Sequence, residues 1–143
     1  MNGFLRACSE NGIRQGNIVV IESGFHEQHG YNSTKRMLEI CSKKLPRGIV
    51  AVNDPAAFGA MKALAEAGLS VPDDIAIVGF SDDVRANLLP VPLTTVRQPA
   101  YEVGKKAAQK LFSLIGGISN GIEEIVIETE QVIRRSCGCP YPT

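Results

Sequence analysis

One stretch near the middle of the chain, Gly48 to Pro55, constrains the fold more than any other. Its apolar run from Ile49 to Val52 is typical of a short buried strand, and the run ends in Asn-Asp-Pro. Asn53 or Asp54 suits a helix N-cap, and Pro55 suits the first helical turn. Apolar residues then recur at steps of three and four, as in a helix: Phe58, Met61, Leu64 and Ala65. A buried strand that leads through a polar turn into a helix predicts an α/β fold, in which ligands bind at the carboxyl ends of the strands.

The chain before and after this stretch repeats the alternation of helix and strand. The predicted elements are a helix over 3–11, strands over 18–21 and 49–52 separated by a helix over 29–44, the helix after Pro55, and a strand over 75–80. Short connections between alternating elements imply parallel strands with right-handed crossovers. The predicted fold class is therefore α/β with a doubly wound parallel sheet.

The pattern changes after Asp83. Residues 88–99 contain three prolines and are expected to be extended, whereas Pro99 opens a helix that ends before Gly116-Gly117. Alternating apolar residues predict a last strand over 123–133. The tail from Arg134 to Thr143 is expected to be mobile.

Composition narrows the possible functions. The chain has 143 residues, 44% of them hydrophobic, which is enough for one domain with a core. Its 15 basic residues balance 15 acidic ones, so no charge pattern indicates nucleic-acid binding. No apolar run is long enough to cross a membrane, and the first residues do not form a signal peptide, so a cytoplasmic location is expected. Glycine-rich phosphate-binding motifs are absent, and no cofactor is predicted.

The three predicted strand ends bring a small set of side chains to one edge of the sheet. They are Phe25, Asn53, Asp54, Ser81, Asp82 and Asp83. An aromatic ring, an amide and short oxygen-bearing side chains suit a small polyhydroxylated or heterocyclic ligand. The alternative is that Asn53 and Asp54 only cap a helix, that Asp82 only shapes a turn, and that Phe25 belongs to the core.

Catalytic and metal-binding interpretations find less support. Ser23, His26 or His29, and Asp54 could compose a Ser-His-Asp set, but no Gly-x-Ser-x-Gly elbow accompanies them. Cys8 and Cys41 fall on apolar helix faces. Cys137-Gly138-Cys139 has neither a second cysteine pair nor a nearby histidine, so it is weak evidence for zinc binding, and metal or redox chemistry is not expected there. We therefore predict neither an enzyme nor a metal site.

The order and spacing of several motifs resemble the C-terminal effector-binding region of the LacI/GalR transcription regulators. The resemblance covers Gly3 to about Ser136. Its motifs are Gly3-Phe4-Leu5, Val52-Asn53-Asp54, Ala57-x-Gly59-Ala60-Met61-x-Ala63-Leu64, Gly68-Leu69-x-Val71-Pro72-Asp73-Asp74-Ile75, Val78-Gly79-Phe80, Pro92-Leu93-Thr94-Thr95-Val96, Arg97-Gln98-Pro99, Gly104-x-x-Ala107 and Val132-Ile133-Arg134-Arg135-Ser136.

This resemblance implies a fold and a function. Family members are cytoplasmic, DNA-binding dimers, in which a two-lobed periplasmic-binding-protein-like domain holds a sugar or nucleobase effector and so changes operator affinity. Residues 1–98 would form most of the second lobe, and 99–117 a helix that belongs to the first lobe. Residues 118–136 would return to the second lobe, and 137–143 would be a tail. The operator would be read by an N-terminal domain that this chain does not contain.

The resemblance also implies roles for single residues. Asn53 matches a position that bonds the effector, Phe25 matches one where an aromatic stacks on it, and Gln98 lies at the crossover between the lobes. Ser81 occupies a position where many members carry an effector-binding aspartate. A serine is shorter and uncharged, so either Asp82 compensates or the effector differs.

Three expectations concern the intact protein. An arginine that binds the effector in many members would lie before this chain begins. The apolar face of the helix over 99–115 would seek a partner, such as the same helix of a second copy. The alternatives to a regulator are a fragment of a periplasmic sugar-binding protein and a sensor module fused to an output enzyme, for which Ser136-Cys137-Gly138-Cys139 would begin the linker.

Overall fold

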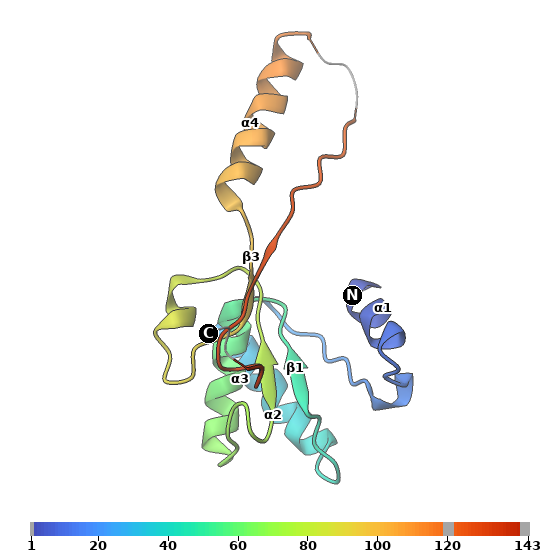
Figure 1. Cartoon of the computed structure of the whole chain (residues 1–143), viewed down its shortest axis with the longest axis vertical. Helices are drawn as coiled ribbons and strands as arrows, with labels where there is room; N and C mark the ends of the chain where they lie inside the picture. The colour runs from blue at the N-terminus through green and yellow to red at the C-terminus, as the bar shows by residue number, and fades with distance from the viewer. Residues whose placement is uncertain (1, 119–121, 141–143) are drawn as a thin grey trace.

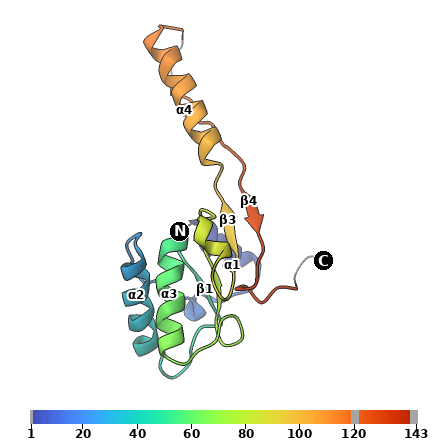
Figure 2. The same ribbon diagram turned by 90° about the vertical axis from the view of Figure 1, so that its left-hand side faces the viewer.

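The computed structural model describes residues 2–118 and 122–140 and shows a body from which one helix projects (Figures 1 and 2). The helices are α1 (Asn2–Glu10), α2 (Glu27–Ile40), α3 (Asp54–Glu66) and α4 (Ala100–Ile115). The strands are β1 (Gly48–Val50), β2 (Ala76–Val78), β3 (Thr95–Arg97) and β4 (Glu130–Val132). Two 3₁₀ turns, η1 (Gln15–Asn17) and η2 (Val84–Asn87), complete the described elements. No described helix has the length and apolar character needed to cross a membrane.

The strands of the body run parallel, as the alternation of elements predicts. β1 pairs with β2 so that Ile49 lies opposite Ile77. Two further parallel bridges, Val78 to Thr94 and Ser81 to Arg97, place β3 on the other side of β2. β3 also pairs antiparallel with β4. The carboxyl ends of β1 and β2 therefore lie beside β3, the strand that leads out of the body toward α4.

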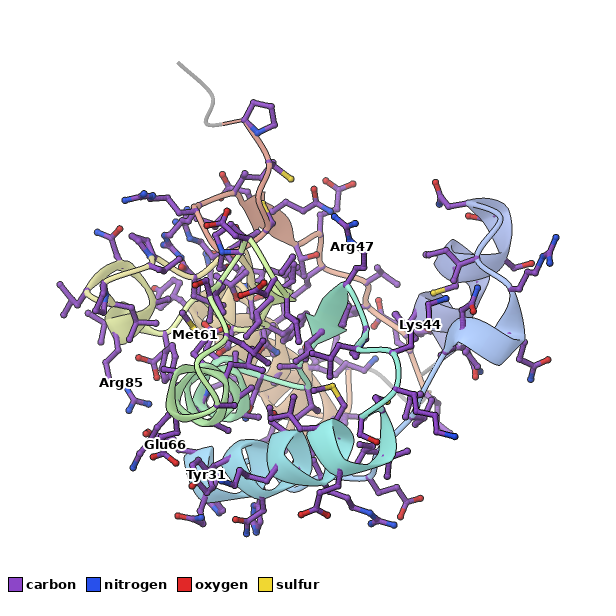
Figure 3. The ribbon with its side chains drawn as sticks, turned by 90° about the horizontal axis from the view of Figure 1, so that it is seen from below. Tyr31, Lys44, Arg47, Met61, Glu66 and Arg85 are labelled. Carbon is purple, nitrogen blue, oxygen red and sulfur yellow. The ribbon has the colours of Figure 1, made fainter. Side chains whose placement is uncertain are left out.

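The core lies where α2 and α3 pack on each other and α3 packs on β2. Its fully buried centre contains Leu64, Ile75, Ile77 and Leu93. The two helices approach closely because a Cβ at Gly30 would collide with the carbonyl of Ala56, and one at Gly59 with the carbonyl of Glu27. At the outer side of this contact the Tyr31 hydroxyl donates to Glu66 at 2.6 Å (Figure 3).

The turn between β1 and α3 has the predicted capping. Asn53 is the N-cap of α3, and its Oδ1 accepts the backbone N–H of Ala56 at 2.9 Å. Pro55 lies in the first turn of α3, where the backbone N–H that proline lacks would have no partner within the helix. Gly68 follows the helix with φ of 74°, the left-handed conformation that glycine adopts without strain.

One predicted strand does not form, and another is much shorter than predicted. Residues 18–21 form no strand, and Val19 and Val20 are about half exposed, at 49% and 50%. β1 pairs only with β2 among the described residues, so the other edge of β1 is not paired with this apolar run. The strand predicted over 123–133 is confined to β4, because β3 offers it a partner along three residues only. Residues 122–129 run back from the end of α4 without regular structure (Figure 1).

The predicted mobile tail is fixed to the core at its beginning. Ser136 is fully buried, its hydroxyl donates to the carbonyl of Ile77 at 2.6 Å, and its Oγ accepts the N–H of Thr94 at 2.8 Å. One serine thus joins β2 to the start of β3. Residues 141–143, the end of that predicted tail, lie outside the described residues.

Candidate functional site

Asp54 joins the three chain segments that meet at the carboxyl ends of the parallel strands. Its side chain has no exposed surface. Oδ1 accepts the hydroxyl of Thr95 at 2.6 Å, and Oδ2 accepts the backbone N–H of Asp83 at 2.7 Å. Gly79 leaves the space for this carboxylate, because a Cβ there would collide with Oδ1. The structure therefore places Asp54 beneath the predicted site, where it positions the loop after β2 against β3.

Asn53 and Phe25 lie together above this junction. The Asn53 side-chain amide donates from Nδ2 to the carbonyl of Phe25 at 2.8 Å while its Oδ1 caps α3. One N–H and one oxygen lone pair of the amide are still available. The Phe25 side chain is 66% exposed, so it does not belong to the core. A fixed amide beside an exposed aromatic ring can bond a hydroxyl and cover the apolar face of a ring.

Ser81 and Asp82 adopt backbone conformations that non-glycine residues rarely take. Their φ values are 119° and 55°. Hydrogen bonds hold both residues in place: the N–H of Ser81 donates to Val96 O at 2.9 Å, and the N–H of Asp82 donates to Thr95 Oγ1 at 3.4 Å. Such conformations cost roughly 1–3 kcal/mol each and cluster at functional sites, where the surrounding structure fixes them.

The Asp82 carboxylate is held by two arginines, Arg97 of β3 and Arg134, which lies just after β4. Arg134 Nη2 donates to Oδ1 at 2.7 Å, and Arg97 Nε donates to Oδ2 at 2.8 Å. Arg97 also pairs with Glu130 of β4 at 2.9 Å. Burial of the Asp82 carboxyl favours its neutral form, but the hydrogen bonds from Arg134 and Arg97 outweigh burial and lower its pKa below the usual value. Asp82 is therefore a fixed anion that orients two cations at the rim of the site.

Sequence reasoning missed three residues of this site: Thr95, Arg97 and Arg134. Thr95 is 41 residues from Asp54 along the chain, and Arg134 is 52 residues from Asp82. No local pattern relates positions so far apart. The one available signal was Arg97 itself, which immediately precedes the predicted Gln98.

The predicted site residues fall into two groups that Asp54 connects. Asn53 bonds Phe25, whereas Ser81 and Asp82 face β3 through the contacts above. Gln98 follows β3 directly and is exposed, at the point where the chain leaves the body for α4. Among residues 2–118 and 122–140, no three histidine, cysteine or carboxylate side chains are grouped closely enough to hold a metal ion.

Comparison with known proteins relates this arrangement to a large group of sequences. A family model described as a periplasmic binding protein-like domain matches residues 1–137. The HTH-type transcriptional repressor PurR of Mannheimia succiniciproducens is 32% identical over 134 residues, which make up 94% of this chain and 40% of that protein. The chain thus spans about two-fifths of the length of that relative.

Solved structures show the same fold. A LacI family transcriptional regulator from Enterococcus faecium with bound ribose superposes with a TM-score of 0.82 at 30% identity, covering 94% of this chain and 48% of that one. The lac repressor dimer bound to operator and the anti-inducer ONPF gives a TM-score of 0.84 at 27% identity, covering 95% and 40%.

Proposed function

This chain belongs to the periplasmic binding protein-like domain family as part of a LacI/GalR-type effector-binding region, and from that membership we propose that it contributes one wall of a small-molecule receptor. The ligand is a small sugar or a nucleobase-like molecule. The observation that carries the proposal is that Asn53 and Asp82 follow the carboxyl ends of β1 and β2, where Asn53 bonds the backbone of the exposed Phe25 and two arginines hold Asp82.

Each proposed contact has a chemical role. The exposed ring of Phe25 stacks on an apolar ring face, and the remaining N–H and lone pair of Asn53 bond a hydroxyl or a ring nitrogen. The Ser81 hydroxyl makes no hydrogen bond within the described part of the chain, which leaves it free to bond the ligand. Asp82 and Gln98 line the side next to β3, and Asp54 supports the site from beneath without touching the ligand.

The ribose-bound relative supports a sugar as the ligand, because it matches this chain over 94% of its length. The family resemblance implies an aspartate at position 81, where this chain has a serine. A serine would bond fewer hydroxyls of the ligand than an aspartate would. The ligand would then depend more on Phe25 and Asn53.

We further propose that ligand binding controls the affinity of the intact protein for operator DNA. The support is that the relatives are transcriptional regulators and that β3 connects the site directly to the projecting α4. The DNA would be contacted by a domain outside this chain. On the same grounds we propose a cytoplasmic homodimer without enzymatic activity.

A thermal-shift screen of the chain against ribose, other monosaccharides and nucleobases at millimolar concentration tests the receptor proposal. A ligand at a hundredfold over its Kd stabilises the chain by about 2.7 kcal/mol. Phe25→Ala should abolish the shift at little cost in stability, because this side chain is largely exposed.

Ile40→Ala is the matched control, since Ile40 is a similarly exposed apolar side chain at the last residue of α2. The shift should survive in this variant. A shift that Phe25→Ala leaves unchanged, or no shift with any sugar or nucleobase, would count against the receptor.

A further inference from the structure

Two cysteines that the effector site does not use lie together at the end of the described chain. Only Gly138 separates Cys137 from Cys139, and the backbone N–H of Cys139 donates to Cys137 Sγ at 3.3 Å. Two residues in a fully extended chain span roughly 7 Å, which is at the upper limit for the Cα atoms of a disulfide. Gly138 has φ of 69°, and this left-handed bend brings the two cysteines closer than an extended chain would.

The first cysteine is held in a fixed position. Its neighbour Ser136 is buried between β2 and β3, and the N–H of Gly138 donates to Arg135 O at 3.2 Å to close a turn. Gly138 lies against the ring of Pro72. Two thiols held close together react as though each were present at high concentration, so an intermediate formed on one is quickly captured by the other.

The pair is also accessible from solvent through Cys139. Cys139 is exposed, Cys137 and Cys41 are half-buried, and Cys8 is buried. Burial disfavours the Cys137 thiolate, but hydrogen bonds from Cys139 and Thr94 outweigh burial and lower the pKa of Cys137. The hydrogen bond to Cys137 raises the pKa of Cys139. The backbone N–H of Cys139 that donates to Cys137 Sγ acts in the same direction, so the thiolate forms more readily on Cys137 than on Cys139.

We propose that Cys137 and Cys139 form a redox-active dithiol that exchanges with low-molecular-weight disulfides and closes reversibly to an intramolecular disulfide. The Cys137 thiolate attacks one sulfur of the external disulfide, whose S–S bond breaks and releases one thiolate. Cys139 then loses its proton to solvent and attacks Cys137 Sγ. The Cys137–Cys139 bond forms as the second external thiolate leaves. The chain gives up two electrons, and the external disulfide becomes two thiols.

The test is to incubate the chain with oxidised glutathione and to locate modified cysteines by alkylation and mass spectrometry. The wild-type chain should lose two of its four free thiols, without retaining glutathione, and dithiothreitol should restore them. Cys139→Ser removes the sulfur that resolves the mixed disulfide, so this variant should retain one glutathione on Cys137.

Cys41→Ser is the matched control and should behave as the wild type does. The proposal is overturned if Cys137 and Cys139 both remain alkylatable at a glutathione disulfide concentration that modifies Cys41. It is equally overturned if the wild-type chain accumulates a stable glutathione adduct on either member of the pair.

Discussion

Asp54 connects the loop after β2 to β3 from a buried position. It has no exposed surface, and its two oxygens accept hydrogen bonds from Thr95 and Asp83. Hydrogen bonds to a charged acceptor contribute more than neutral ones, and losing the acceptor leaves both donors buried without a partner. The geometry of the loop after β2 therefore depends on this carboxylate.

Asp54→Ala should lower the free energy of unfolding by about 3 kcal/mol, because two buried donors lose their partner. Urea unfolding followed by circular dichroism measures this change. Asp73→Ala is the control, since Asp73 is exposed and should change stability by less than about 0.5 kcal/mol. Equal effects in the two variants would contradict the role assigned to Asp54.

The pair formed by Asp82 and Arg134 predicts a pH dependence of stability. Both side chains are only 12% exposed, and the pKa of Asp82 is lowered in the folded chain. A carboxyl with a lowered folded-state pKa stabilises the fold above its unfolded pKa of about 3.9, and this contribution is lost as the pH falls through the folded pKa.

The stability difference between the wild type and Asp82→Asn should therefore be constant from neutral pH down to about pH 4 and shrink below it. At neutral pH we expect about 2 kcal/mol, the contribution of charged hydrogen bonds. Urea unfolding of both chains across this range measures it. A difference that grows on acidification would show that Asp82 is not held as an anion.

At the scale of elements, the contact between α2 and α3 depends on two glycines. Gly59→Ala should destabilise the chain by about 3 kcal/mol or more, because the added Cβ would meet the Glu27 carbonyl and force the helices apart. Gly3→Ala in α1 meets nothing within 4 Å and should leave stability unchanged or raise it by up to about 1 kcal/mol. Thermal unfolding compares the two, and a neutral Gly59→Ala would show that the helices pack less closely.

The projecting helix α4 has more apolar surface than one contact covers. Its exposed apolar side chains occupy roughly 180° of the helix circumference, whereas a helix that packs on one neighbour needs an apolar stripe of about 100°. These side chains are Tyr101, Val103, Leu111, Phe112, Leu114 and Ile115. Tyr101 and Phe112 flank a shallow, open surface over the small residues Gly104 and Ala108. We expect a second copy of α4 to pack there.

Sedimentation velocity tests this self-association. The mass of the wild-type chain should rise with concentration, and Phe112→Lys should keep it a monomer because the lysine charge cannot be buried in the contact. Val84→Lys, equally exposed but on η2, should behave as the wild type does. A single monomer mass for the wild type at every concentration would contradict the expectation.

At the scale of the whole molecule, the features that could be predicted from the sequence are those set by neighbouring residues. The Asn53 cap, Pro55 and Gly68 lie within one short stretch, and the structure confirms each of them. The strand before them also forms, but over Gly48–Val50, and its predicted burial is wrong because Val50 is 63% exposed. The sequence therefore predicted which residues lie at the carboxyl ends of β1 and β2. It also indicated the family, because the spacing of its motifs extends over nearly the whole chain.

The features that could not be predicted depend on contacts between residues far apart in the sequence. Residues 18–21 have the composition of a strand, yet they form none, since composition does not supply a neighbouring ladder. Ser136 was expected in a mobile tail and is instead buried against Ile77, 59 residues away. Arg134 reaches Asp82 for the same reason, through the return of the chain beside β3.

The proposed small-molecule site lies where the carboxyl ends of β1 and β2 meet β3. The most direct measurement is an NMR titration of the ¹⁵N-labelled chain with ribose at millimolar concentration. We expect saturable shift changes centred on Phe25, Asn53, Ser81, Asp82 and Gln98, with α1 unaffected. Saturable changes confined to other parts of the chain, or no changes with ribose, the other monosaccharides or nucleobases, would contradict the proposed site.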